Sequence, residues 1–184
     1  MSAGLLIGDA SWSSERCVKL LRRTELFGKF PFGALRALLA ASRLVALKKS
    51  RPLFAENDAA QSAFLLADGV LRYSLNGAAD RPIYLAPPAI IGETALIVGC
   101  LRPVTVIADT DAVLMEIPRA TFLRVIAEFP GAAAHTRRLF FGHLRKLVGE
   151  LDAVQLRLVE MALDAPSARD SLEDDVARAV AARR

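Results

Sequence analysis

The stretch that decides the fold runs from Ile91 to Ala108 and reads IGETALIVGCLRPVTVIA. It places Gly92 and Glu93 before one turn of helix formers, Thr94 to Ile97, and a lone Arg102 shortly afterwards. The alternating residues from Val104 to Ala108 predict a strand. Glycine lets the backbone approach a ligand, a helix start favours phosphate, and a guanidinium binds phosphate through two hydrogen bonds. The stretch therefore predicts a small anion-binding cradle, in which Glu93 suits a sugar hydroxyl rather than the anion.

The same stretch resembles the phosphate-binding cassette of the cyclic-nucleotide-binding domain family, with its G-E-x-A-L, a short spacer and R-x-x-T-V-x-A. The matching residues are Gly92, Glu93, Ala95, Leu96, Arg102, Thr105, Val106 and Ala108. The resemblance implies that Glu93 holds the ribose 2′-hydroxyl and that Arg102 holds the cyclic phosphate. The expected ligand-binding residues are Gly92, Glu93, Thr94, Ala95, Leu96, Arg102, Pro103, Val104 and Thr105.

Short apolar runs separated by turn residues follow one another from Leu44 onward. This spacing is typical of a β-barrel or sandwich of jelly-roll type. Helices are expected at residues 14–22 and 32–41, before the strands, and a long helix after them. The family resemblance implies the same α+β fold: a β-roll (a jelly-roll-like double-stranded β-helix) with N-terminal helices and a long C-terminal helix.

The domain organisation expected from these patterns has four parts within the 184 residues. An N-terminal helical extension covers residues 1–25, and the cyclic-nucleotide-binding β-roll covers 26–130, with the cassette at 91–108. A C-terminal lid or dimerisation helix follows at 131–163, and a tail at 164–184. The family resemblance extends over about residues 26–163.

The long helix expected after Pro130 carries apolar residues in alternating steps of four and three. This spacing is the a/d heptad of a coiled coil, and a length of about 30 Å suffices for a dimer contact. The seam consists of Phe140, Leu144, Leu147, Leu151, Val154, Leu158 and Met161. A homodimer through this helix is therefore predicted, with packing of the stripe on the protein's own β-roll as the alternative.

The family resemblance also implies that this helix covers the base of the nucleotide. The expected lid and dimer residues are Leu144, Leu147, Val148 and Leu151. Their apolar side chains cover a base without reading its edge, so the expected ligand is cyclic AMP or cyclic GMP.

Several other functional classes are disfavoured. The sequence contains no run of roughly 20 apolar residues and no basic signal-peptide start, so we expect a cytoplasmic protein without membrane contact. The tail, 164–184, holds at most one short helix, whereas a helix-turn-helix needs two, so we expect no direct DNA binding.

Enzymatic chemistry is not expected either. His135 and His143 stand eight residues apart, which is not the i, i+4 spacing that grips zinc, and no nucleophile adjoins a base. The sequence predicts no catalytic residue, no metal site and no cofactor besides the nucleotide ligand. Cys17 and Cys100 are expected to be free thiols.

Pro103 departs from the family pattern. The residue after the cassette arginine usually offers a backbone N–H to the phosphate, and proline has none. Losing one hydrogen bond to a charged group costs about 1.5–3 kcal/mol, or about ten- to a hundredfold in affinity.

The predicted function is a stand-alone cyclic nucleotide sensor that signals to an unknown protein partner through its C-terminal helix. The alternative is a dimerising interaction module whose degenerate pocket binds nucleotide weakly or not at all. Pro103 favours this alternative, whereas the retained Glu93 and Arg102 favour the sensor.

Overall fold

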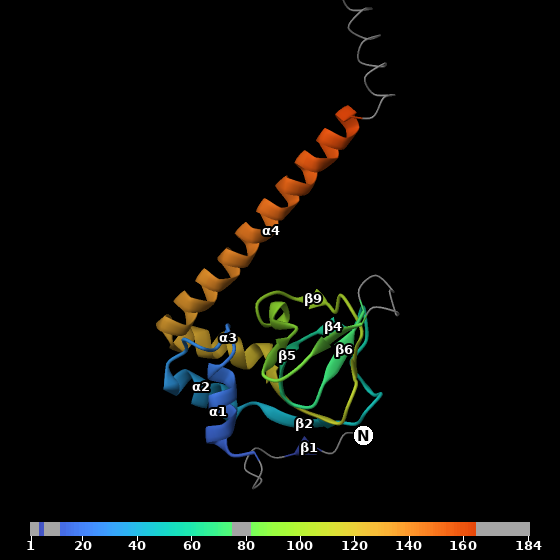
Figure 1. Ribbon diagram of the computed structural model, residues 1–184. Coiled ribbons are helices and arrows are strands. Elements are labelled where there is room, and N and C mark those ends of the chain that lie inside the picture. The colour runs from blue at the N-terminus through green and yellow to red at the C-terminus, as the bar shows by residue number, and fades with distance from the viewer. Residues whose placement is uncertain (1–3, 6–11, 75–81, 165–184) are drawn as a thin grey trace, which may run out of the picture. The chain divides into compact units, whose positions relative to one another are not determined.

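The computed structural model describes residues 4–5, 12–74 and 82–164 of the chain (Figure 1). It divides into two compact units, Met1–Arg137 and Arg138–Arg184. The first unit contains the strands, three helices and the beginning of a fourth. The predicted division at residues 25, 130 and 163 stays a prediction, and the tail lies outside the described residues except for Asp164.

Every described strand pair of the first unit is antiparallel. The larger sheet has the order β1 (Gly4–Leu5), β2 (Arg43–Leu47), β11 (Ala112–Pro118), β5 (Ser62–Asp68) and β8 (Ala89–Ile91). The second has the order β3 (Pro52–Phe54), β10 (Val106–Ala108), β6 (Leu71–Tyr73) and β7 (Ile83–Leu85). A short third sheet pairs β4 (Ala59–Ala60) with β9 (Cys100–Leu101). The expected α+β β-roll is confirmed.

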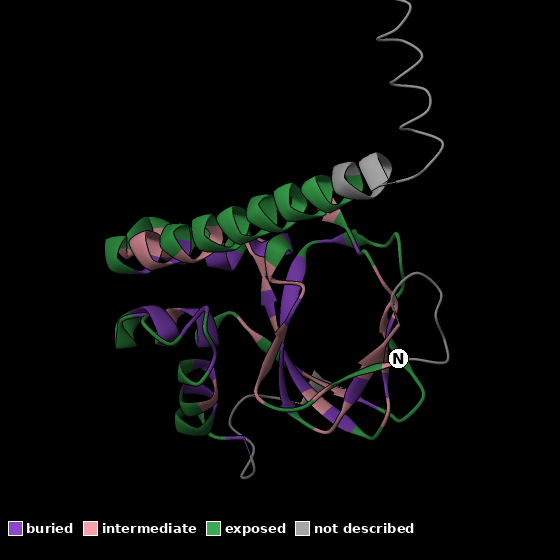
Figure 2. Cartoon of the chain, turned by 45° about the horizontal axis from the view of Figure 1, so that its top comes forward, coloured by how far each residue is buried: buried purple, intermediate pink, exposed green. Residues whose placement is uncertain are grey.

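The core of the roll lies between the two larger sheets. β5 is buried at every position except the last because both of its faces are covered, one by the core of the roll and the other by the Glu93–Leu96 turn and the first helix. Leu66 and Leu114 from the larger sheet meet Leu71 and Val106 from the second sheet in one apolar cluster. Figure 2 shows buried segments in purple along the strands of the roll. Burial of such leucine and valine side chains stabilises the roll by about 1.5–3 kcal/mol each.

Three helices form a second apolar cluster beside the strands: α1 (Ser14–Arg22), α2 (Phe32–Ala40) and α3 (Arg119–Glu128) (Figure 1). The rings of Phe27, Phe30 and Phe122 join them, with centroids 5.3–6.3 Å apart. α1 has the predicted bounds because Ser13 caps its start through a bond from the Arg16 amide. α2 ends one residue before the predicted end.

The long C-terminal helix is confirmed as α4 (Pro130–Asp164). Its first residues belong to the first unit, where Ala132 is buried and His135 Nε2 lies 3.0 Å from the Glu25 carbonyl oxygen. From Arg138 onward α4 belongs to the second unit, and its described apolar side chains beyond Phe140 are exposed. None of the helices in the described part of the chain has both the length and the apolarity that crossing a bilayer requires.

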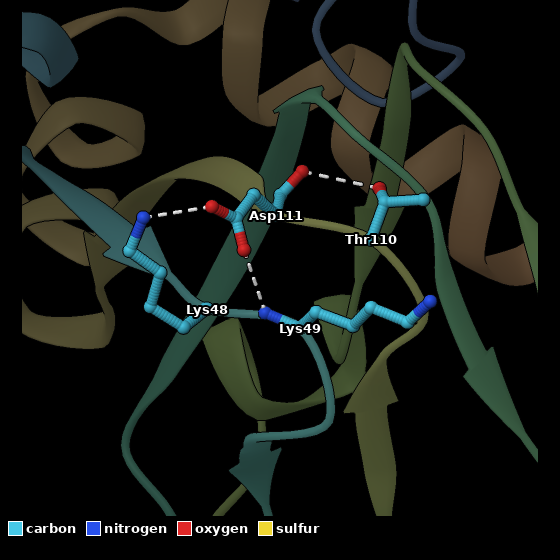
Figure 3. Close-up of polar contacts among 4 residues, drawn as sticks. All are labelled: Lys48, Lys49, Thr110 and Asp111. Carbon is cyan, nitrogen blue, oxygen red and sulfur yellow. Dashed lines mark hydrogen bonds and ion pairs between the residues drawn. The ribbon is translucent and has the colours of Figure 1, made fainter.

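A hydrogen-bonded turn before β11 joins three segments of the roll, and Figure 3 shows the contacts between two of them, at Thr110–Asp111 and Lys48–Lys49. Asp111 accepts a bond from Lys48 Nζ at 2.7 Å and one from the Lys49 amide at 2.8 Å. The neighbouring Thr110 hydroxyl accepts a bond from the Val70 amide at 2.9 Å. The two bonds from Lys48 and Lys49 occupy both oxygens of the Asp111 carboxylate and give this residue a structural role at the turn.

Asp111 should make the stability of the roll sensitive to acid. The Lys48 hydrogen bond, followed by the Lys49 amide, holds the pKa of Asp111 below its ordinary value of 3.8. A depressed pKa stabilises the fold above pH 3.8, and that contribution is lost as the pH falls through the folded-state pKa. We expect Asp111→Asn to have a lower thermal midpoint than the wild type at pH 7. On acidification, the midpoint of the variant should fall less than that of the wild type. A difference in midpoint between the wild type and the variant that stays constant from pH 7 to pH 2.5 would contradict this role.

Candidate functional site

A cavity of about 640 Å³ lies beside the cassette. Its apolar wall comes from β3, β7, β8 and β10, and includes Phe54, Leu85 and Ile90. Glu56, Tyr73, Ser74, Glu93 and Arg102 supply the polar groups that line it. The volume lies within the range of about 300–1,000 Å³ that is usual for small-molecule sites.

Gly92 turns the chain from β8 into the cassette. Its φ of +73° is left-handed, a conformation that glycine adopts without the steric cost of a side chain. The residues after it, Glu93–Leu96, form a 3₁₀ turn in which the Ala95 amide donates to the Gly92 carbonyl at 3.1 Å. The predicted helical turn is therefore present but shorter than an α-helix, and the Ala95 amide is occupied within it.

Arg102 is buried in the wall of this cavity, with 5% of its surface exposed. Its Nη2 donates to the Ser62 carbonyl at 2.7 Å, whereas Nη1 is buried without a hydrogen-bond partner in the described structure. Nη1 lies against Gly92, where an added Cβ would sit 2.2 Å from it. Burial lowers the pKa of Arg102 below its ordinary value, although Cys100, Asp58 and Glu116 act in the opposite direction. The site thus holds a buried cation with an unsatisfied donor.

The turn between β3 and β4 forms hydrogen bonds with the backbone around Arg102. The Arg102 amide donates to the Asp58 carbonyl at 2.8 Å, and the Asn57 amide donates to the Arg102 carbonyl at 2.9 Å. The Glu56 amide donates to Thr105 Oγ1, also at 2.9 Å. The strand predicted from Val104 therefore begins only at Val106, since the residues before it bind this turn.

Arg119, the first residue of α3, connects the cassette to this helix through hydrogen bonds. Its Nε donates to the Ala95 carbonyl and its Nη2 to the Ala60 carbonyl, both at 2.5 Å. A cation is disfavoured in the first turn of a helix, and α3 has no acidic residue there to offset it. The two carbonyl acceptors supply that compensation, so Arg119 joins the 3₁₀ turn, β4 and α3.

The predicted ligand-binding residues occupy two kinds of position. Gly92, Glu93, Arg102, Pro103 and Val104 line the cavity. The other four do not: Ala95 and Leu96 are buried, Thr94 is exposed, and Thr105 binds the Glu56 amide. The predicted lid residues, Leu144, Leu147, Val148 and Leu151, are exposed on α4 in the second unit.

Sequence reasoning did not find the other residues of the site. Phe54 lies 4.2 Å from the Arg102 guanidinium, measured from Cζ to the ring centroid, and Phe64 lies 5.7 Å from it. Ser62 and Glu56 also escaped notice, because their roles depend on strand pairing between distant segments. Within the described ranges, no group of three or more histidine, cysteine or acidic residues is placed to hold a metal ion.

The antiparallel roll, the cavity and the buried arginine beside a left-handed glycine together form a β-roll with a cavity suited to a small anionic ligand. The sequence model of the family described as "Cyclic nucleotide-binding domain" matches residues 44–129. The matched segment contains the cassette and strands β3 to β11.

Several solved structures are similar to this chain. A cyclic nucleotide-binding-like protein from Brucella abortus is 27% identical, with a TM-score of 0.54, over 60% of this chain and 97% of its own. The regulatory domain of Toxoplasma gondii PKA, crystallised with cAMP, is 25% identical, with a TM-score of 0.60, over 76% and 53%. The catabolite activator protein of Thermus thermophilus shares the fold at 23% identity, with a TM-score of 0.60, over 72% and 63%.

Substitution of Gly92 should damage both the turn and the arginine. Alanine there adopts a left-handed φ at a cost of about 1–2 kcal/mol, and its Cβ displaces Arg102 Nη1. We expect Gly92→Ala to lower the free energy of unfolding by at least that amount in a denaturant titration. Gly149→Ala is the matched control, since no atom lies within 4 Å of the added methyl group. Equal stability of Gly92→Ala and the wild type would contradict the assigned geometry.

Proposed function

We propose that the protein is a cyclic nucleotide sensor in which Arg102 captures the cyclic phosphate. The observation that carries this proposal is the buried guanidinium whose Nη1 has no acceptor. An unmet buried donor costs about 1–3 kcal/mol, and more when it is charged, so an anion that reaches it recovers this energy. Because the described residues give Arg102 no carboxylate partner, the anion need not displace one.

The rest of the cavity suits the other parts of a cyclic nucleotide. Glu93 lines it beside Gly92 and supplies a carboxylate for the ribose 2′-hydroxyl. The apolar wall at Leu85 and Ile90 offers a surface for a base. The cAMP bound to the Toxoplasma gondii relative supports this ligand class. Cyclic AMP and cyclic GMP both fit the proposal, because none of these contacts reads the edge of the base.

Ligand capture would change the structure through the cassette. Nη1 lies against Gly92, so the anion reaches it only when this turn or the guanidinium shifts. Arg119 ties the turn to α3, and only Phe129 separates α3 from α4. A ligand that favours the shifted turn would therefore shift the population of α3 and α4 conformations.

The output of the sensor would pass through α4. Its exposed seam residues, from Leu144 to Leu158, suit a homodimer contact, and their conformation would be what a protein partner recognises. We propose that Leu144, Leu147, Val148 and Leu151 form the lid and dimer surface. We also propose that the protein is cytoplasmic, has no catalytic activity, and does not contact DNA or membranes directly.

A second function is favoured by one specific observation. Pro103 lines the cavity where the family offers a backbone N–H, and proline cannot donate one. The chain would then serve as a dimerising interaction module with a degenerate pocket. Ligand affinity separates the two functions.

Displacement of a fluorescent cyclic nucleotide tests the sensor. We expect the wild type to bind with a dissociation constant below about 100 μM, whereas Arg102→Ala binds at least tenfold more weakly because it lacks the cation. Pro103→Ala restores the missing N–H and should bind about tenfold more tightly than the wild type. The measurements are made with cyclic AMP and with cyclic GMP.

Arg102→Lys serves as the second variant, because it keeps the positive charge while losing the two-armed hydrogen-bond geometry. Thermal melts of both variants check that they fold. No displacement by the wild type at about 100 μM of either nucleotide, which corresponds to about −5.5 kcal/mol, would exclude the sensor. Equal affinities of the wild type and folded Arg102→Ala would place the site elsewhere.

The dimer is tested at the α4 seam. Leu151 is 61% exposed, and a glutamate there would place two charges at the centre of the predicted contact. We expect Leu151→Glu to sediment as a monomer at concentrations where the wild type is a dimer. Ala153→Glu is the control, because it adds the same side chain two positions away, outside the a/d seam. A monomeric wild type, or a dimeric Leu151→Glu, would refute the predicted interface.

A further inference from the structure

The buried cation of the cavity wall has very few polar contacts for a charged group. Arg102 is 5% exposed, and its side chain makes one hydrogen bond, from Nη2 to the Ser62 carbonyl. No described carboxylate forms an ion pair with it, and Nη1 has no partner. Buried charges are usually paired with an opposite charge, so another interaction must stabilise this guanidinium in the ligand-free protein.

Two aromatic rings provide that interaction. The Arg102 Cζ lies 4.2 Å from the centroid of Phe54 and 5.7 Å from that of Phe64. The two rings are themselves 6.1 Å apart and tilted by 34°. A guanidinium within about 6 Å of a ring centroid is attracted by the electron-rich face of the ring, most strongly where water is excluded. Phe54, at the end of β3, makes the closer of the two contacts.

An aromatic face differs from a carboxylate in one respect that matters for ligand capture. A carboxylate partner would neutralise Arg102 and would have to be displaced by an incoming phosphate. A ring stabilises the cation but carries no net charge, so the positive charge stays available to an anion. Phe54 also lines the cavity, on the same wall as Arg102.

We propose that Phe54 is a positioning residue for the anion site, and that ligand affinity depends on the electron density of its ring rather than on its volume. This proposal rests on the proposed function, because it assigns the residue that keeps Arg102 charged, buried and unpaired. The Ser62 carbonyl holds one arm of the guanidinium, Gly92 borders the other, and the Phe54 face supports the plane between them.

The competing explanation is that Phe54 only fills space, since it also packs against the apolar core of the roll. Fluorinated phenylalanines separate the two roles, because successive fluorine atoms withdraw electron density from the ring with little change in its shape. Incorporation of mono-, di- and trifluorophenylalanine at position 54 of the full chain is followed by displacement of fluorescent cyclic AMP. Thermal midpoints are measured on the same samples.

We expect the affinity to fall stepwise with fluorine number, by about tenfold or more at three fluorines, and the midpoint of the ligand-free protein to fall in the same order, because the ring also stabilises the buried cation there. Phe54→Tyr should bind within about twofold of the wild type, whereas Phe54→Leu should bind about tenfold more weakly. The same fluorine series at Phe64 is the matched control, and its shallower slope should follow from the longer distance.

A wild-type affinity in every fluorinated variant, or an affinity that tracks only side-chain volume, would overturn the role of Phe54. Failure of the wild type to bind cyclic AMP or cyclic GMP would instead overturn the proposed function, and with it the role of Phe54 in that function. The ligand-free protein gives an independent readout, since ring currents should shift the Arg102 Nε–Hε resonance upfield. An unshifted resonance would show that Phe54 does not face the guanidinium in solution.

Discussion

The burial of one arginine is the constraint on which the site depends. Arg102 carries a positive charge in the wall of the roll, where desolvation is costly and no carboxylate of the described structure forms an ion pair with it. The surrounding chain is arranged to accept this charge, through the Ser62 carbonyl, the face of Phe54 and the space left by the missing side chain of Gly92. Each contact comes from a different strand or turn, so the three contacts are present together only when the roll is folded.

The same constraint connects the site with the helices. The turn between β3 and β4 clasps the backbone of Arg102, and Arg119 fastens the neighbouring 3₁₀ turn to α3. A change at the cassette would therefore reach the β3–β4 turn and α3. The hydrogen bonds of Arg119 also explain why a cation is tolerated at the start of a helix, where the helix dipole disfavours it.

Sequence patterns anticipated the local features of the fold well. The helix at 14–22, the long helix after Pro130 and the glycine turn into the cassette all follow from capping, periodicity and the preference of glycine for positive φ. Two details came out differently because tertiary contacts overrode local preference. The strand predicted from Val104 starts at Val106, since Thr105 binds the Glu56 amide, and the cassette turn is 3₁₀ rather than α-helical.

The sequence by itself determined which residues are proposed to bind the ligand: a glycine, a glutamate and an arginine at a fixed spacing within 91–108. That information is local, because backbone conformation and side-chain type are properties of neighbouring residues. Only the tertiary structure decided that Arg102 is buried, that Phe54 faces it and that Arg119 forms a hydrogen bond to the cassette turn. Burial and cross-strand contact depend on the register between segments tens of residues apart, and no single stretch of sequence contains it.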